Sequence, residues 1–127
     1  MKTLLLSLFF VCTTANANLF LPACYNYSSG TDAVSYSYQS CVNNNFRAID
    51  RATRGNTFFQ YCSNLGNQVS YFFISCIQNN FREVERSLSD RNLFLQRCSN
   101  FRPDTLDFSF TSCVNSNWRS VERAFRN

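Results

Sequence analysis

The sequence contains no histidine in 127 residues, and Lys2 is its only lysine. A serine or cysteine nucleophile needs a neighbouring base, which is usually one of these two residue types. None of the seven cysteines forms a Cys-x-x-Cys pair, the spacing of many structural zinc sites. We therefore expect no metal site and no cofactor. We also expect no enzymatic activity; the alternative is a hydrolase that works with carboxylates alone, for which Glu83, Asp90 and Asp107 are the candidate acids.

Long apolar runs are also absent. The run over residues 4–11 is far shorter than the ~20 apolar residues that a membrane-spanning helix needs. It follows Lys2 and precedes Ala-Asn-Ala at 15–17, a small-x-small pattern after which signal peptidase cuts. We predict a signal peptide over 1–17, cleavage between Ala17 and Asn18, secretion to the extracellular space or the periplasm, and no insertion into a membrane.

Charge of either sign is sparse, since Lys and Arg together number twelve and Asp and Glu eight. Without Lys2, which belongs to the signal peptide, eleven arginines remain. Proteins that bind nucleic acid carry denser basic patches, and most of these arginines lie within four residues of a carboxylate. The composition argues against nucleic acid as a partner.

What the sequence does have is internal repetition. The stretches SCVNNNFRAIDRA, SCIQNNFREVERS and SCVNSNWRSVERA begin at Ser40, Ser75 and Ser112. Each is preceded by a shorter repeated stretch, NLFLPAC, NTFFQYC or NLFLQRC. The region 18–127 is therefore predicted to be one domain of three repeats: 18–55, 56–91 and 92–127. Repeats of this length are typical of two-helix units.

Each repeat contains two cysteines, one in the short stretch and one in the long stretch. The three repeats thus contain six cysteines, and an even number of cysteines in a small exported protein predicts disulfide bonds. Pairing within repeats is the simplest arrangement, because a unit below ~40 residues usually needs a covalent staple, and each such loop contributes on the order of 3 kcal/mol. The predicted pairs are Cys24 with Cys41, Cys62 with Cys76, and Cys98 with Cys113. The alternative pairs Cys41 with Cys62 and Cys76 with Cys98, which leaves Cys24 to meet Cys113.

The long stretches carry apolar residues at the spacing of an α-helix. In the third repeat the stripe runs from Leu106 to Phe125, and the cap signals near Asp32, Asn67 and Asp104 suggest a helix of about six turns. The short stretches are apolar and preceded by capping residues, so we expect a short helix in each. The predicted fold is all-α, with three disulfide-stapled two-helix repeats stacked as a small solenoid or bundle.

One pattern supports a different fold. Residues 34–41 and 106–113 alternate apolar and polar side chains, which is the signature of a strand. The alternative fold is therefore α+β, with a strand before each long helix. On the helical interpretation, Tyr36, Tyr71 and Phe108 leave the apolar stripe and are expected to pack against a neighbouring repeat.

An Arg-acid-Arg cluster recurs in each long stretch. Its acids are Asp50, Glu85 and Glu122, and on a helix each lies beside both neighbouring arginines. We expect a ladder of salt bridges; the alternative is a basic stripe that binds an anionic partner, because arginine forks fit carboxylate and phosphate. The candidate partner-binding residues are Arg47, Arg51, Arg82, Arg86, Arg119 and Arg123.

Two functions remain open from the sequence. The first is an interaction module that presents an arginine- and aromatic-bearing repeat surface to a protein or an anionic surface. The second is a carrier that holds a small apolar ligand in an aromatic-lined helical core. Separately, Asn26-Tyr27-Ser28 is a candidate glycosylation site in a eukaryotic source.

Overall fold

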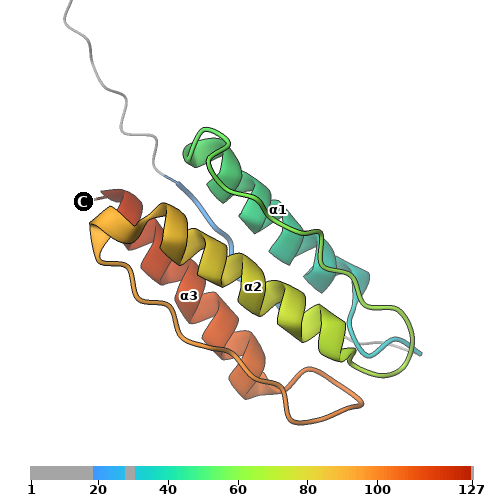
Figure 1. Cartoon of the computed structure of the whole chain (residues 1–127). Coiled ribbons are helices and arrows are strands. Elements are labelled where there is room, and N and C mark those ends of the chain that lie inside the picture. The colour runs from blue at the N-terminus through green and yellow to red at the C-terminus, as the bar shows by residue number, and fades with distance from the viewer. Residues whose placement is uncertain (1–18, 28–30, 127) are drawn as a thin grey trace, which may run out of the picture.

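The computed structural model describes residues 19–27 and 31–126, so the predicted signal peptide, its cleavage site and Cys12 lie outside the described residues. The described part contains three α-helices: α1 (Tyr36–Ala52), α2 (Tyr71–Ser87) and α3 (Phe108–Arg126) (Figure 1). A short 3-10 helix, η1 (Ser89–Arg91), follows α2. Neither described range contains a strand. The all-α prediction is confirmed, and the alternative with a strand before each long helix is not supported.

Each long helix begins later than the sequence suggested. Ser35 and Ser70 cap α1 and α2, with their side chains accepting from the backbone N–H of Tyr38 and Phe72. The chain before each cap is held in a loop by an asparagine amide. The loop asparagines accept from the backbone N–H of the residue just before each helix: Asn26 from Ser35 at 2.7 Å, Asn64 from Ser70 at 2.6 Å and Asn100 from Asp107 at 2.6 Å.

The short apolar stretches are not helical, so that prediction is wrong. We refer to residues 19–27, 56–65 and 93–102 as the short segments; each runs without regular secondary structure beside a long helix. In the second and third repeats, a side-chain amide on the helix forms hydrogen bonds with both backbone groups of one residue in the short segment of the same repeat. Asn80 donates to the carbonyl of Gln60 at 2.8 Å and accepts from its N–H at 3.0 Å, and Asn117 does the same with Gln96 at 2.8 and 2.9 Å. These backbone groups are then not available for a helical turn.

Three disulfides join each short segment to the helix of its own repeat. They link Cys24 to Cys41, Cys62 to Cys76 and Cys98 to Cys113, with Cα–Cα distances of 5.7, 5.6 and 5.6 Å. The pairing within repeats is confirmed, and the alternative pairing is wrong.

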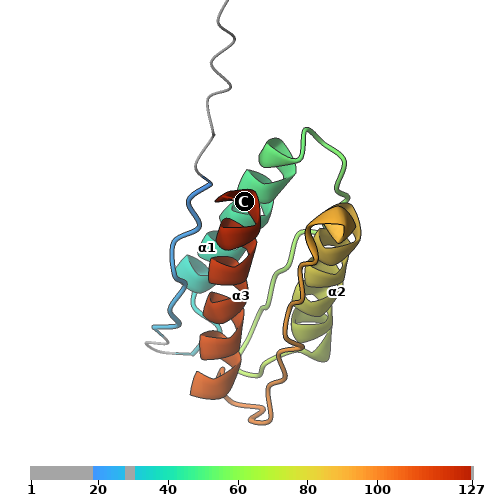
Figure 2. The same ribbon diagram turned by 90° about the vertical axis from the view of Figure 1, so that its left-hand side faces the viewer.

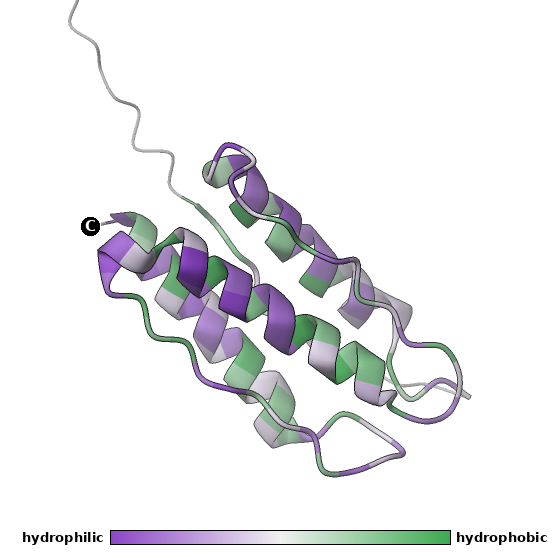
Figure 3. Cartoon of the chain, viewed as in Figure 1, coloured by the Kyte–Doolittle hydropathy of each residue, from purple (hydrophilic) through white to green (hydrophobic). Residues whose placement is uncertain are grey.

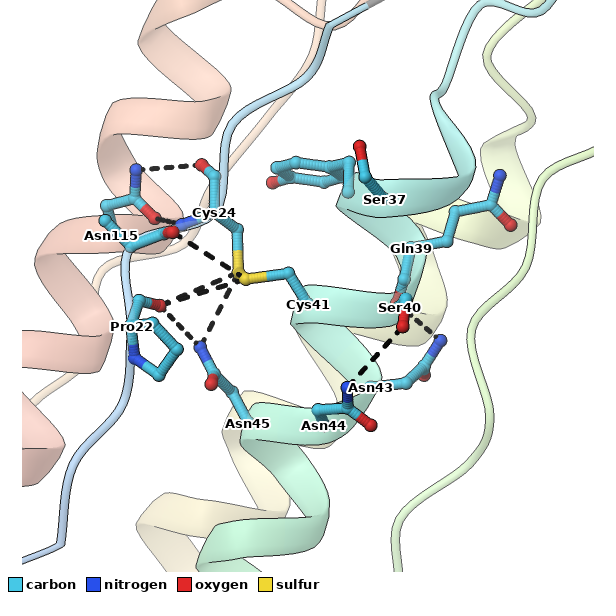
Figure 4. Close-up of a disulfide and its surroundings, with 12 residues drawn as sticks. Pro22, Cys24, Ser37, Gln39, Ser40, Cys41, Asn43, Asn44, Asn45 and Asn115 are labelled. Atoms are coloured by element: carbon cyan, nitrogen blue, oxygen red, sulfur yellow. Dashed lines mark hydrogen bonds between the residues drawn. A yellow bond between two sulfur atoms is a disulfide. The ribbon is translucent and has the colours of Figure 1, made fainter.

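The third repeat contacts the first, so the three helices form a closed bundle rather than an open stack (Figure 2). Phe46, Phe81 and Trp118 meet in the centre, where their ring centroids lie 4.8 to 5.2 Å apart. At the edge, the amide of Asn115 on α3 binds both backbone groups of Cys24, at 2.8 and 3.0 Å (Figure 4). A solenoid of three units would keep its first and last units apart, and this part of the prediction is not observed.

The three helices run in the same direction, so their N-termini lie at one end of the bundle and their C-termini at the other (Figures 1 and 2). Parallel helices align their dipoles, which leaves partial negative charge at the C-terminal end. Arginines in the last turns offset this charge: Arg51 in α1, Arg86 in α2, and Arg123 and Arg126 in α3. In α2 the hydropathy accordingly changes from apolar near its start to polar near its end (Figure 3).

Tyr36, Tyr71 and Phe108 do not pack against a neighbouring repeat. Each is the first residue of its helix and is about four-fifths exposed. The expectation failed because the loop asparagines delay the helix start, which places these rings at the rim of the bundle. Among the described residues, none of the helices is both long and apolar enough to cross a membrane.

Candidate functional site

The six candidate arginines all lie in the second half of the long helices, and all six are exposed: Arg47, Arg51, Arg82, Arg86, Arg119 and Arg123. They therefore lie toward one end of the bundle, where the helices finish, and Arg119 also reaches a groove that Tyr27 and Phe108 line. We call this the arginine end. It also contains the exposed residues Arg54, Arg91 and Arg126.

The acids between these arginines bind the short segments instead of the arginines beside them. Glu122 accepts from the backbone N–H of Leu21 at 2.7 Å, and Glu85 accepts from that of Leu95 at 3.3 Å. Asp50 accepts from the hydroxyl of Thr57 at 2.5 Å. In each case the carboxylate binds the short segment of another repeat. The acids hold the bundle together, and the predicted salt-bridge ladder does not form in the described part of the chain.

The ion pairs that do form are few. Arg86 pairs with Glu83 on its own helix, and Arg126 lies 3.7 Å from Glu122. The hydrogen bond from Arg86 lowers the pKa of the Glu83 carboxyl below its ordinary value. Within residues 19–27 and 31–126, the other five candidate arginines have no carboxylate at ion-pair distance. Their guanidinium groups keep donors available.

Two equivalent grooves lie beside these arginines. The first, of about 370 Å³, lies between α1 and the second short segment, with Arg47, Phe58 and Tyr61 along it. The second, of about 260 Å³, lies between α2 and the third short segment, with Arg82 and Phe94 at the matching positions. We call them the arginine–phenylalanine grooves.

Phe58 and Phe94 are each 81% exposed, although both belong to stretches that the sequence suggested were buried helices. Sequence reasoning missed them because an apolar residue in a repeat is ordinarily assigned to the core. Their position was the available signal: Phe20, Phe58 and Phe94 precede the first cysteine of each repeat by four residues. All three rings are exposed.

The candidate glycosylation residue Asn26 has a structural role. Its amide donates to the carbonyl of Ala33 at 3.0 Å and accepts from the N–H of Ser35 at 2.7 Å. Asn64 and Asn100 make the corresponding contacts in the other repeats, and neither is followed by the sequence that a glycosylation site requires. The residue type at position 26 is thus explained by the loop that it closes.

Two acids outside the repeated clusters also accept backbone hydrogen bonds. Asp107 accepts from the backbone N–H of Phe101 at 2.6 Å, and Glu83 accepts from that of Phe58 at 3.2 Å. Among the described residues, no group of three or more His, Cys, Asp or Glu side chains converges in a way that could hold a metal ion.

Comparisons with models of protein families, with curated proteins and with solved structures gave no match.

Proposed function

We propose that the protein is a secreted, non-catalytic interaction module whose arginine end binds an acidic partner protein. One observation carries this proposal. Asp50, Glu85 and Glu122 bind neighbouring short segments, so most of the repeated arginines are left without an internal carboxylate. A planar guanidinium with five donors fits the carboxylates of a partner particularly well.

The grooves supply an apolar component beside this charge. Phe58 lies near Arg47, and Phe94 lies near Arg82, with both rings largely exposed. Arginine and aromatic side chains are the residues most enriched at the energetic centres of protein interfaces. Because the groove occurs twice, an extended partner that fills both gains affinity from the second contact without a further loss of translational freedom.

The alternative, a carrier of a small apolar ligand, has less support. A carrier needs a cavity in its aromatic interior. Here Phe46, Phe81 and Trp118 are buried and in direct contact, so the side chains themselves fill the centre of the bundle. Both arginine–phenylalanine grooves are bordered by exposed rings and are better suited to a chain that lies along the surface.

The test uses the oxidised mature protein and a fluorescent synthetic peptide of repeating Asp-Phe. We expect the double variant Arg47→Gln/Arg82→Gln to bind this peptide at least tenfold more weakly by anisotropy. The matched control, Asn67→Glu/Ser109→Glu, changes the net charge equally but lies at the other end of the bundle; its affinity should stay within about twofold, since surface charges beyond a Debye length are screened. Equal losses in both variants would contradict the proposal.

A further inference from the structure

Seven large apolar side chains project from the end of the bundle opposite the arginines. They lie near the C-terminal ends of the short segments and in the first turns of the helices. Their exposed fractions run from 73% to 92%. The seven residues are Tyr27, Leu65, Phe101, Tyr36, Tyr71, Phe72 and Phe108. Three of them occupy the same position in each loop, and three others are the first residue of each helix. We call this the aromatic end.

This much exposed apolar surface has no role in the fold of a single chain. The seven side chains together expose roughly 1,000 Å², at the area that large aromatic residues carry. The largest apolar patch on an ordinary monomer is about 300–600 Å², and a standard protein interface buries about 800 Å² on each partner. The aromatic end is therefore large enough to form a stable interface.

The two ends of the bundle carry opposite charge. The charged residues at the aromatic end are Asp32, Asp104 and Asp107 against Arg102 and Arg97, which line a groove with Tyr71 and Phe101, so acids exceed arginines there by one. The arginine end carries nine arginines against five acids: Asp50, Glu83, Glu85, Asp90 and Glu122. Two aromatic ends that met face to face would bring acids together, whereas an aromatic end on an arginine end would bring opposite charges together.

Contacts between arginine and aromatic rings already join the repeats within one chain. The guanidinium of Arg47 on α1 lies 6.0 Å from the ring centre of Tyr61 in the second short segment. That of Arg91, after α2, lies 5.0 Å from the ring centre of Phe125 on α3. A cation over an aromatic face is attracted by the ring's charge distribution, and the attraction increases as water is excluded.

From these observations we propose that the aromatic end of one molecule docks on the arginine end of a second copy, so that molecules associate head to tail. The inference rests on the proposed function, for which it names the partner. Such a contact uses two different surfaces of the same chain, so each new molecule binds through one surface and leaves the other free for the next, and an open chain of molecules grows.

Complementation between two variants tests this geometry. Leu65→Ser/Tyr71→Ser/Phe101→Ser disables the aromatic end without adding charge, and Arg51→Glu/Arg86→Glu/Arg123→Glu disables the arginine end. All six positions are exposed, so the fold should be retained, which circular dichroism and the mass of the oxidised protein can check. Sedimentation velocity is then measured over a series of concentrations.

We expect the mass of the unmodified protein to rise steadily with concentration and each variant alone to remain a monomer. An equimolar mixture of the two variants should form a species of twice the monomer mass and grow no further, because only one intact pair of surfaces remains. Dimers of the arginine-end variant alone would show face-to-face contact of aromatic ends, which overturns the proposal.

Two further outcomes also overturn it. A mixture that stays monomeric shows that the two ends do not bind. Binding of the unmodified protein, but not of the aromatic-end variant, to phosphatidylcholine vesicles without self-association would assign the aromatic end to a lipid surface instead. In both cases, retained binding of the Asp-Phe peptide at the arginine end would support the proposed function. Loss of that binding would contradict both the proposed function and the head-to-tail contact.

Discussion

Asn43 binds both backbone groups of Cys62, donating to its carbonyl at 2.7 Å and accepting from its N–H at 2.9 Å. The two residues belong to different repeats, and both are buried. A side-chain amide here performs the pairing that a neighbouring strand would perform in a sheet. Asn115 makes the same two-way contact with Cys24. This contact is how a segment without regular secondary structure can be buried with its backbone polar groups satisfied.

Replacing Asn43 with alanine should therefore lower the free energy of unfolding by about 2–4 kcal/mol, because two buried backbone groups of Cys62 lose their partners. The matched control is Asn44→Ala, since Asn44 is exposed on the same helix and makes one long contact, 3.5 Å, with the hydroxyl of Ser40. Its effect should stay within about 0.5 kcal/mol. Denaturant unfolding of the oxidised proteins measures both, and similar losses in the two variants would contradict this account.

Tyr38→Phe should stabilise the protein. The Tyr38 hydroxyl is buried and has no hydrogen-bond partner in the described structure. The equivalent residues in the other repeats are Phe73 and Phe110, which fill the same position without a hydroxyl. We expect a gain of about 1 kcal/mol in the free energy of unfolding, because the cost of desolvating the hydroxyl disappears. Tyr36→Phe, at an exposed ring, should change nothing measurable; a loss of stability in Tyr38→Phe would disprove the prediction.

The gain from Tyr38→Phe should also grow at alkaline pH. Burial raises the pKa of the Tyr38 hydroxyl well above its ordinary value. Above about pH 10 the unfolded chain therefore loses this proton while the folded chain keeps it. Stability then falls by up to about 1.4 kcal/mol per pH unit through this one group, and the phenylalanine variant lacks this loss. Unfolding at about pH 8 and about pH 11 compares the two proteins, and an unchanged difference would refute the assignment.

The structural role of the Asn26 amide can be tested separately from glycosylation of this residue. Asn26→Ala removes both contacts of the loop amide and should lower the free energy of unfolding by about 1–2 kcal/mol in any host. Ser28→Ala removes the glycosylation sequence but keeps the amide, so it is the matched control and should leave the stability unchanged in a host that adds no glycans. Equal effects of the two substitutions would show that the amide contacts contribute nothing.

The long helices and the disulfides could be predicted because their signals are local. The apolar stripe from Val42 through Phe46 to Ile49 repeats at 3.6-residue spacing, and all three side chains are buried. Each disulfide closes a loop within one repeat, with sequence separations of 17, 14 and 15 residues. Neither inference required knowledge of how the repeats are arranged in space.

The short segments could not be predicted in the same way. Leu95 and Cys98 are both buried, and apolar residues three positions apart fit a helical turn as well as an irregular segment. What decides between the two is the amide of Asn117, which occupies both backbone groups of Gln96 from another part of the chain. The spacing of the apolar residues does not reveal this contact; its signal in the sequence is the asparagine that recurs at positions 45, 80 and 117.

The candidate site was predicted only in part. The repeated arginines were chosen as candidates by their residue type, and the structure shows that all six are exposed. The expected ladder of salt bridges was wrong, because Glu122 and Glu85 bind short segments of other repeats, 101 and 10 positions away in the sequence. The aromatic end was missed altogether, since Tyr71 and Phe108 were assigned to packing between repeats and instead lie at the helix starts.

The contact between Cys24 and Asn115 joins residues 91 positions apart, nearly the whole length of the domain. The first short segment is synthesised well before α3, so it can contact Asn45 on α1 early but lacks its contact with Asn115 until α3 has been made. A chain that stops before α3 lacks Trp118, which fills the centre, as well as the amide that holds Cys24. The complete bundle can therefore form only once α3 is present, through contacts between residues far apart in the sequence. The disulfide within each repeat can meanwhile keep that repeat's own segments together until the last helix arrives.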